Sequence, residues 1–252
     1  MGITETLFSN WHLVVSFFVI AILYSSVGFG GGSSYLAVLA LTSWAYPEIR
    51  ATALLCNIMV VSNSFYIYYK NGYYNFKKVI PLVITSIPLA FIGGYLKISE
   101  TIFYILLGFT LLIAAVLMLI NKSESFPKPE SKTLKSLSYG GFIGFISGMV
   151  GIGGGIFLAP LLHLTNWDTS KKIAATASLF ILVNSISGLS GQILNPEFHI
   201  NTTSTLILLA TTFIGGQIGT RISIQLINPI LLKRATALLI AFVAIKLLVN
   251  QF

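Results

Sequence analysis

Two glycine clusters, one in each half of the chain, are the residues with the clearest capacity for chemistry. They read Val27-Gly28-Phe29-Gly30-Gly31-Gly32 and Val150-Gly151-Ile152-Gly153-Gly154-Gly155. Each glycine destabilises a helix by about 1 kcal/mol, so each cluster predicts a break between two helical segments. A helix that restarts after a break presents unpaired N–H groups and the positive end of its dipole, which bind anions without a charged side chain.

We therefore predict that the two clusters meet and hold an anion through backbone N–H groups and serine hydroxyls. Close helix packing is the alternative explanation, because small residues let helices approach one another. The predicted contacts are Ser25, Ser26, Gly28, Gly30, Gly31, Gly32, Ser33, Ser34, Gly151, Gly153, Gly154 and Gly155.

A polar face follows each cluster on the next apolar run. Thr52, Cys56 and Asn63 are spaced i, i+4 and i+11, which places them on one side of a helix. Asn184 lies in the corresponding run of the second half. Polar side chains in a membrane usually face the bundle interior or a cavity, so we expect Asn63 and Asn184 to contact the substrate. Hydrogen bonds between helices are the alternative role.

Two further polar features lie near the ends of apolar runs. Gln217 and Arg221 form an i, i+4 pair that could hold an anion at a cytoplasmic vestibule, with an interfacial anchor as the alternative. His163 follows Pro160 and is a candidate for proton coupling, because its ordinary pKa lies near neutrality. A structural role is the alternative for this histidine.

Several kinds of site are excluded by what the apolar runs lack. All 7 acidic residues fall in loops or at the ends of runs, which argues against a cation carrier and favours an anion as cargo. The single cysteine, Cys56, excludes an intramolecular disulfide and a multi-cysteine metal site. We expect no metal, no organic cofactor and no enzymatic activity, and a scaffold protein remains an alternative.

The elements that must position these residues are membrane helices. The chain has 252 residues, of which 55% are hydrophobic and 9% charged, and its mean hydropathy is +0.87. A soluble domain carries about 25% charged residues. Continuous apolar runs predict helices rather than a barrel. The runs are 11–28, 31–44, 51–69, 78–96, 101–120, 137–150, 153–165, 173–191, 202–220 and 229–249.

The two halves of the chain repeat one another. The glycine clusters are followed by Ala51-Thr52-Ala53 and Ala175-Thr176-Ala177, and then by Phe91-Ile92-Gly93-Gly94 and Phe213-Ile214-Gly215-Gly216. Three matches in the same order at nearly constant spacing indicate an internal repeat. We therefore divide the chain into an N-terminal repeat (1–120), a cytoplasmic linker (121–136) and a C-terminal repeat (137–252).

Lysine and arginine placement predicts the orientation. The net charge of +8 comes from residues in short gaps between runs, so it sets topology and does not indicate nucleic-acid binding. With the linker cytoplasmic and both termini outside, only Arg50, Lys97 and Lys246 of the 15 basic residues lie outside. Each half then consists of a glycine-broken hairpin and three spanning helices, about 8–10 membrane segments in all. Three further crossings invert the second half relative to the first, as in many secondary transporters.

The glycine clusters, the repeated halves and the length together resemble the sulfite exporter TauE/SafE family, also called the toluene-sulfonate uptake permease family. The resemblance covers roughly 12–249, and its most specific parts are 27–34, 150–160 and 213–221. It implies a transporter of small sulfur-containing anions, such as sulfite or organosulfonates, in the inner membrane and without an organic cofactor. One departure is that 95–99 lacks counterparts of Gly219 and Arg221.

The expected partners are a small anionic substrate, the lipid bilayer, and a proton or sodium ion as the coupling ion. A homodimer is an assembly that the sequence leaves open. Export is the expected direction. An anion channel with the same site, or an uptake permease for another small organic anion, is the alternative function.

Overall fold

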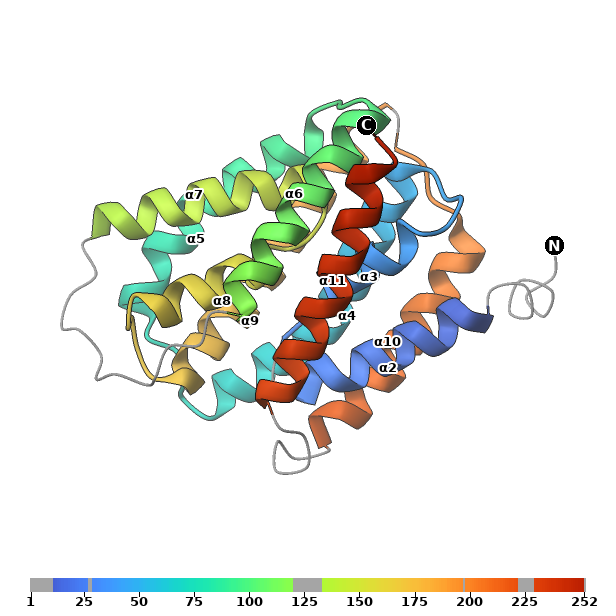
Figure 1. Cartoon of the computed structure of the whole chain (residues 1–252). Helices are drawn as coiled ribbons and strands as arrows, with labels where there is room; N and C mark the ends of the chain where they lie inside the picture. Colours follow the sequence, from blue (N-terminus) through green and yellow to red (C-terminus); the bar gives the residue numbers. More distant parts are fainter. Residues whose placement is uncertain (1–10, 27–28, 120–132, 197, 222–228, 252) are drawn as a thin grey trace.

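The computed structural model describes residues 11–26, 29–119, 133–196, 198–221 and 229–251, and all regular structure among them is α-helical (Figure 1). The prediction of an all-α membrane protein is confirmed. The helices are α2 (Trp11–Ser26), α3 (Gly32–Leu39), α4 (Tyr46–Lys70), α5 (Phe76–Tyr95), α6 (Glu100–Leu119), α7 (Thr133–Val150), α8 (Gly155–Leu164), α9 (Ser170–Ile193), α10 (Thr202–Arg221) and α11 (Pro229–Val249).

Four of these helices, α4, α5, α6 and α9, are long and apolar enough to cross a membrane. Helix α7 begins at Thr133, so the last residues of the predicted linker 121–136 belong to a helix. The rest of that linker lies outside the described residues.

Both glycine clusters interrupt helices where the sequence predicts a break. Helix α2 ends at Ser26 and α3 begins at Gly32, while α7 ends at Val150 and α8 begins at Gly155. In the second break Gly151, Gly153 and Gly154 have φ values of 89°, 82° and 83°. Only glycine adopts these left-handed conformations without a steric cost, so this chain reversal depends on them.

Helices of one half pack mainly against helices of the other. Helix α5 lies against α7 and α9, α2 against α10, α4 against α9, and α6 against α11. By the sequence repeat, helices α2 to α6 correspond in order to helices α7 to α11. If each helix is exchanged for its counterpart, the α5–α7 pair becomes the α10–α2 pair, and the α4–α9 and α6–α11 pairs stay the same. The contacts are therefore those expected of two halves related by a twofold axis.

Small residues let these pairs approach closely. Gly140, Gly144 and Gly148 of α7 lie so near the α5 backbone that a Cβ atom at any of them would overlap a carbonyl oxygen. The repeated Phe-Ile-Gly-Gly motif packs in the same way. Gly93 of α5 lies against the backbone of α7, and Gly215 of α10 lies against the backbone of α2. Close packing is thus the role of these glycines.

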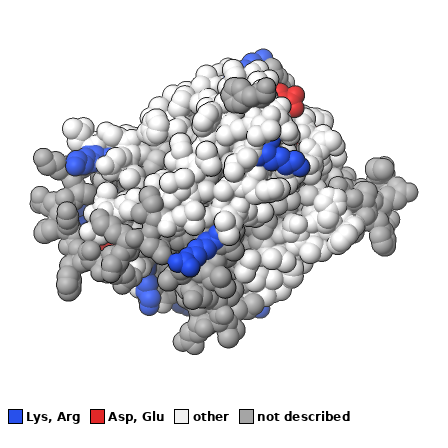
Figure 2. Space-filling view, in the orientation of Figure 1, with Lys and Arg blue, Asp and Glu red and all other residues white. Residues whose placement is uncertain are grey.

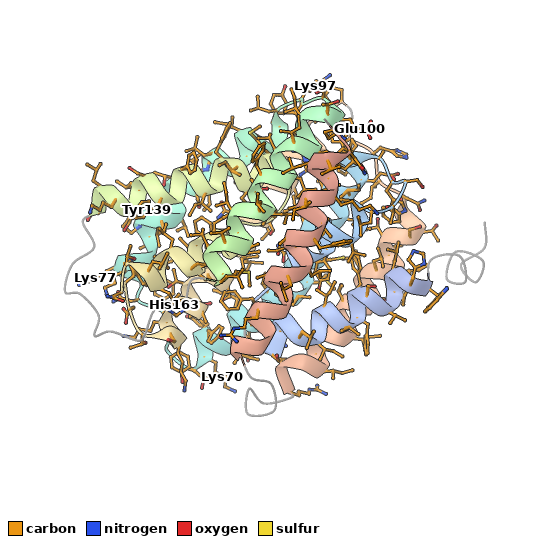
Figure 3. All side chains as sticks on the ribbon, in the orientation of Figure 1. Lys70, Lys77, Lys97, Glu100, Tyr139 and His163 are labelled. Atoms are coloured by element: carbon orange, nitrogen blue, oxygen red, sulfur yellow. The ribbon has the colours of Figure 1, made fainter. Side chains whose placement is uncertain are left out.

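The outer surface is that of a membrane protein. Most of the face shown in Figure 2 is uncharged, with a few lysine or arginine side chains on it. Large apolar side chains such as Ile113, Phe142 and Phe242 are 53%, 68% and 64% exposed. Charged side chains lie at opposite ends of the molecule, with Lys97 and Glu100 at one end and Lys70 and Lys77 at the other (Figure 3). A chain with so much exposed apolar surface requires lipid around it.

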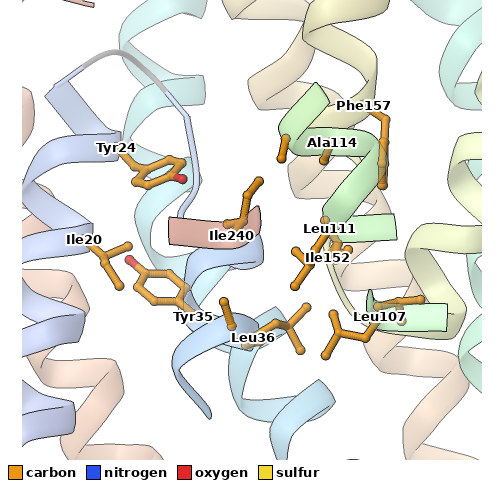
Figure 4. Close-up of a cluster of buried hydrophobic side chains, with 14 of the residues drawn as sticks. Ile20, Tyr24, Tyr35, Leu36, Leu107, Leu111, Ala114, Ile152, Phe157 and Ile240 are labelled. Carbon is orange, nitrogen blue, oxygen red and sulfur yellow. The ribbon is translucent and has the colours of Figure 1, made fainter. Parts of the chain in front are cut away.

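The packed interior brings the two breaks together. Figure 4 shows Leu36 of α3 on the side of Leu107 and Leu111 of α6, with Ile152 of the second break near them, while Tyr35 of α3 points toward Ile20 of α2. All of these side chains are buried. A helix of 8 residues such as α3 is not stable by itself, so it depends on these buried contacts.

Candidate functional site

A cavity of about 230 Å³ lies where the two glycine breaks meet. It reaches His163, which lies toward the end of the molecule that carries Lys70 and Lys77 (Figure 3). Its walls come from α2, α3, α4, α6, α8, α9, α11 and both breaks. The lining residues are Tyr24, Phe29, Gly30, Gly32, Ser33, Asn57, Met118, Ile152, Gly155, Ile156, Ala159, Pro160, His163, Ile181 and Thr236.

One side chain, Asn57 of α4, ties the two breaks to each other. Its Oδ1 accepts a hydrogen bond from the Gly32 N–H at 3.1 Å, and its Nδ2 donates to the Ile152 carbonyl oxygen at 3.0 Å. Nδ2 also lies 3.4 Å from Ser185 Oγ of α9. Asn57 is 1% exposed, so these bonds form away from water. The oxygen and the nitrogen of this amide thus pair with one backbone N–H of the first break and one backbone carbonyl group of the second.

Two helix N-termini face this cavity. Gly32, the first residue of α3, and Gly155, the first residue of α8, both line it. The first N–H groups of a helix have no acceptor within the helix. The Gly32 N–H is bonded to Asn57, whereas no described group accepts a hydrogen bond from the N–H of Ser33 or Ile156. Both dipoles therefore present their positive ends to the same space.

The rest of the wall is mostly apolar. Tyr24, Ser33 and Thr236 supply hydroxyl groups, and the Tyr24 hydroxyl lies 2.7 Å from Ser34 Oγ. No described lysine, arginine or carboxylate lines the cavity. An oxyanion can therefore be held by N–H and O–H donors at the helix ends while an uncharged body contacts aliphatic side chains. Those aliphatic contacts are Met118, Ile152, Ile156, Ala159, Pro160 and Ile181.

The structure brings four of the predicted site residues to this cavity, namely Gly30, Gly32, Ser33 and Gly155.

Other cluster residues are buried close by but do not line it. Gly31 faces Ile20 and Tyr35, and Gly154 faces Phe180. Gly151 packs against Arg50, Gly153 packs against Asn57 and Ser185, and Ser34 contacts Tyr24. Ser25 and Ser26 donate to carbonyl groups of their own helix. Gly28 lies outside the described residues.

The predicted polar residues farther along the chain do not reach the cavity. Asn63 donates to Thr220 Oγ1 at 2.8 Å, and Asn184 donates to the Phe180 carbonyl oxygen of its own helix at 2.8 Å. Gln217 is half-buried on α10, and Arg221 is exposed in the last turn of that helix. These four residues are therefore placed as packing or surface groups.

The polar face of α4 explains why Asn57 was not predicted. At 3.6 residues per turn Asn57 lies about 140° around the helix from Thr52, away from the face that carries Cys56 and Asn63. Thr52 instead hydrogen-bonds to Thr205 at 3.0 Å. The sequence feature that could have identified Asn57 is a side-chain amide in the middle of an apolar run, whichever face of the helix it lies on.

The chain is similar in sequence to known membrane transporter proteins. The model of the family described as "Sulfite exporter TauE/SafE" matches residues 13–247. The chain is 32% identical over 241 residues to the probable membrane transporter protein y4hK of Sinorhizobium fredii, covering 94% of this chain and 97% of that one. It is 25% identical over 240 residues to the probable membrane transporter protein YunE of Bacillus subtilis, covering 84% and 87%.

No solved structure matches the chain. The family match extends from α2 into α11 and so includes both glycine breaks and the cavity between them. The chain therefore belongs to the sulfite exporter TauE/SafE family and is a multi-pass membrane transporter.

Proposed function

We propose that the protein is a secondary transporter that exports small sulfur-containing anions, organosulfonates or sulfite, across the inner membrane. The observation that carries this proposal is the pair of helix N-termini, Gly32 of α3 and Gly155 of α8, that open onto one cavity. Helix N-termini bind sulfonate and sulfite oxygens as readily as other oxyanions, since the N–H groups and the dipole supply the attraction.

The apolar wall favours an organic sulfonate over an inorganic ion. A bare dianion among Ile152, Ile156 and Ile181 would lose its hydration without enough donors to replace the water. A sulfonate with a short carbon body places its charged group at the helix ends and its body against these side chains.

The orientation proposed for the protein places both termini outside and the central linker in the cytoplasm. The second repeat is then inverted relative to the first. The paired contacts between the halves support this arrangement, because an inverted repeat places a twofold axis in the membrane plane. The cavity extends to His163, near the end that carries Lys70 and Lys77, and this end is cytoplasmic in the proposed orientation. A proton or sodium ion is the coupling ion.

The test is transport by purified protein in liposomes. Sulfoacetate, taurine, sulfite and acetate are each supplied inside, and efflux is followed with and without a proton or sodium gradient. Selective efflux of a sulfonate that depends on the gradient is expected. Efflux of acetate but of no sulfur anion would overturn the proposed cargo and favour a carrier of another organic anion.

A cavity-filling variant connects the transport to the site. Ile156→Phe places a larger side chain in the cavity and should reduce efflux at least tenfold. Ile186→Phe is the matched control, because Ile186 is 48% exposed on the outer surface. Substitutions such as Gly31→Val and Gly154→Val are poorer probes. A Cβ atom at Gly31 would come within 2.5 Å of Ile20 Cγ2, and one at Gly154 within 2.7 Å of Phe180 Cε1, so a failure to fold would also stop transport.

An anion channel is the second candidate, and exchange distinguishes it from a carrier. In a carrier, unlabelled substrate on one side accelerates release of labelled substrate from the other. The reason is that a carrier with substrate bound changes its conformation across the membrane faster than an empty one. Linear flux without this acceleration would identify a channel.

A further inference from the structure

A buried arginine lies behind the second glycine break without a carboxylate partner. Arg50 of α4 is 3% exposed, and no described carboxylate forms an ion pair with it. Glu48, two residues earlier, contacts His199 Nε2 at 3.2 Å instead. A buried guanidinium without a counter-charge is costly, so the surroundings must compensate for it.

Part of that compensation comes from two helix ends. Arg50 Nη2 lies 3.3 Å from the carbonyl oxygen of Gly94, 3.5 Å from that of Gly93 and 3.2 Å from that of Gly148. These carbonyl groups belong to the last turns of α5 and α7, where helix dipoles have their negative ends. All three carbonyl groups contact the same guanidinium nitrogen, Nη2, so they compensate only part of the charge of Arg50.

Arg50 also lines a small separate pocket. This pocket measures about 10 Å³ and is lined by Tyr46, Pro47, Arg50, Gln192, Asn195 and Phe198. Arg50 Nε and Gln192 Nε2 are both buried, and neither has an acceptor among the described residues. Gln192 is 4% exposed, so water outside the protein does not reach it freely. Two of the side chains that line this pocket therefore each carry a buried donor without a described acceptor, one of them charged, and the pocket has room for a single small occupant.

We propose that this pocket binds one halide-sized monovalent anion, such as chloride, between Arg50 Nε and Gln192 Nε2. Such an ion supplies both the missing acceptor and the missing counter-charge. A water molecule would accept the two hydrogen bonds but would leave the buried charge uncompensated. The dedicated donor pair and the absence of a described carboxylate at Arg50 favour the ion.

The pocket is distinct from the transport cavity. Arg50 and Gln192 line the pocket and not the cavity, and no described residue lines both spaces. Gly151 of the second break packs on Arg50, and a Cβ atom there would lie 3.1 Å from Arg50 Cα. An ion at this position would hold the end of α9 against α4 and, through Arg50, against the ends of α5 and α7.

Chloride binding to the purified full-length protein tests the proposal. The protein is exchanged into sodium gluconate, and binding of radiolabelled chloride is measured at constant ionic strength. Saturable binding is expected, together with a rise in Tm as chloride replaces gluconate, because a ligand of the folded state stabilises it.

Gln192→Met removes one donor while keeping the length of the side chain. It should weaken chloride binding at least tenfold without lowering the Tm in gluconate, since the lost group has no protein partner. Thr176→Val is the matched control, because it removes another buried unpaired group from α9 outside the pocket. It should leave chloride affinity unchanged.

Three outcomes would overturn the proposal. The first is an absence of saturable chloride binding to the unmodified protein. The second is the same Tm in chloride as in gluconate, which would mean that water fills the pocket. The third is undiminished binding to Gln192→Met, which would place the ion elsewhere. Sulfonate efflux measured in chloride-free gluconate is a separate readout, so failure here does not bear on the transport proposal.

Discussion

Asn57 Nδ2 donates a hydrogen bond of 3.0 Å to the Ile152 carbonyl oxygen, which joins a helix of the first half to the glycine break of the second. The other end of the same amide accepts from the Gly32 N–H of the first break. A single side chain therefore sets how the two helix ends lie relative to one another. The geometry of the proposed anion site depends on this residue even if the amide never contacts an anion.

Replacement of Asn57 should damage both folding and transport. Asn57→Leu leaves the Gly32 N–H and the Ile152 carbonyl oxygen unpaired, at a cost of about 1 to 3 kcal/mol for each group. We expect a lower Tm in detergent and at least a tenfold loss of sulfonate efflux from protein that still folds.

Asn184→Leu is the matched control for that substitution. Asn184 is equally buried, but its Nδ2 bonds only to its own helix and its Oδ1 has no partner among the described residues. We expect a smaller change in Tm. Equal losses in Asn57→Leu and Asn184→Leu would mean that burial of an amide matters and the bridge between the breaks does not.

Two glycines at equivalent positions of the repeat should respond differently to alanine. A Cβ atom at Gly94 would overlap the carbonyl oxygen of Gly188 on α9, so Gly94→Ala must push two backbones apart. The nearest atom to a Cβ at Gly216 is Val60 Cγ2 at 3.7 Å, an ordinary contact. We expect Gly94→Ala to destabilise the fold by about 1 to 3 kcal/mol or more. Gly216→Ala should be neutral or stabilising, because alanine favours helix.

Thermal unfolding of these two variants in the same detergent measures the difference. Similar Tm values would show that the repeat motif packs alike in both halves, in conflict with the asymmetry seen here.

Asp168 should contribute stability that is lost in acid. Its Oδ2 lies 3.0 Å from Lys78 Nζ, and its Oδ1 accepts from the Thr169 N–H at 2.9 Å. Burial acts to raise the pKa of Asp168, but the Thr169 N–H and the charges of Lys78 and Lys172 outweigh it, so the pKa lies below its ordinary value. The folded state therefore binds this proton less tightly than the unfolded state. The stabilisation is fully present above the ordinary pKa of about 4 and disappears as the pH falls through the lower folded value.

Asp168→Asn should thus lower the free energy of unfolding at pH 7 by about 1.5 to 3 kcal/mol, the range for hydrogen bonds to charged groups. The gap to the unmodified protein should narrow as the pH falls below about 4. Lys172→Gln is the control, because Lys172 is 41% exposed and lies 3.7 Å from the carboxylate, so little effect is expected. A gap that stays constant with pH would show that the charge of Asp168 is not the cause.

Cysteine labelling tests the proposed orientation. Lys70 and Lys97 are exposed at opposite ends of the molecule, and the native Cys56 is buried and should remain unlabelled (Figure 3). On intact cells a membrane-impermeant thiol reagent should label Lys97→Cys at once and Lys70→Cys only after permeabilisation. The opposite pattern would reverse the orientation, and labelling of both from outside would refute the spanning arrangement.

The sequence by itself determined the class of fold and the places where the helices break. Both results depend on local properties: low charge and long apolar runs require lipid around helices, and glycine clusters such as 151–155 cannot continue a helix. The recurrence of those clusters at one spacing also indicated the family, which the comparison then showed over 13–247.

Only the tertiary structure decided which side chains reach the cavity between the two breaks. The rotation of α4 in the bundle is set by its packing against α9 and α10, and this rotation turns Asn57 toward the breaks and Asn63 toward Thr220. Likewise, no local pattern distinguishes Gly94, pressed against Gly188, from Gly216, or shows that Arg50 lies between the ends of α5 and α7. These outcomes depend on contacts between segments that lie 25 to 157 residues apart in the sequence. The physical reason is that the orientation of each helix minimises the free energy of the whole assembly.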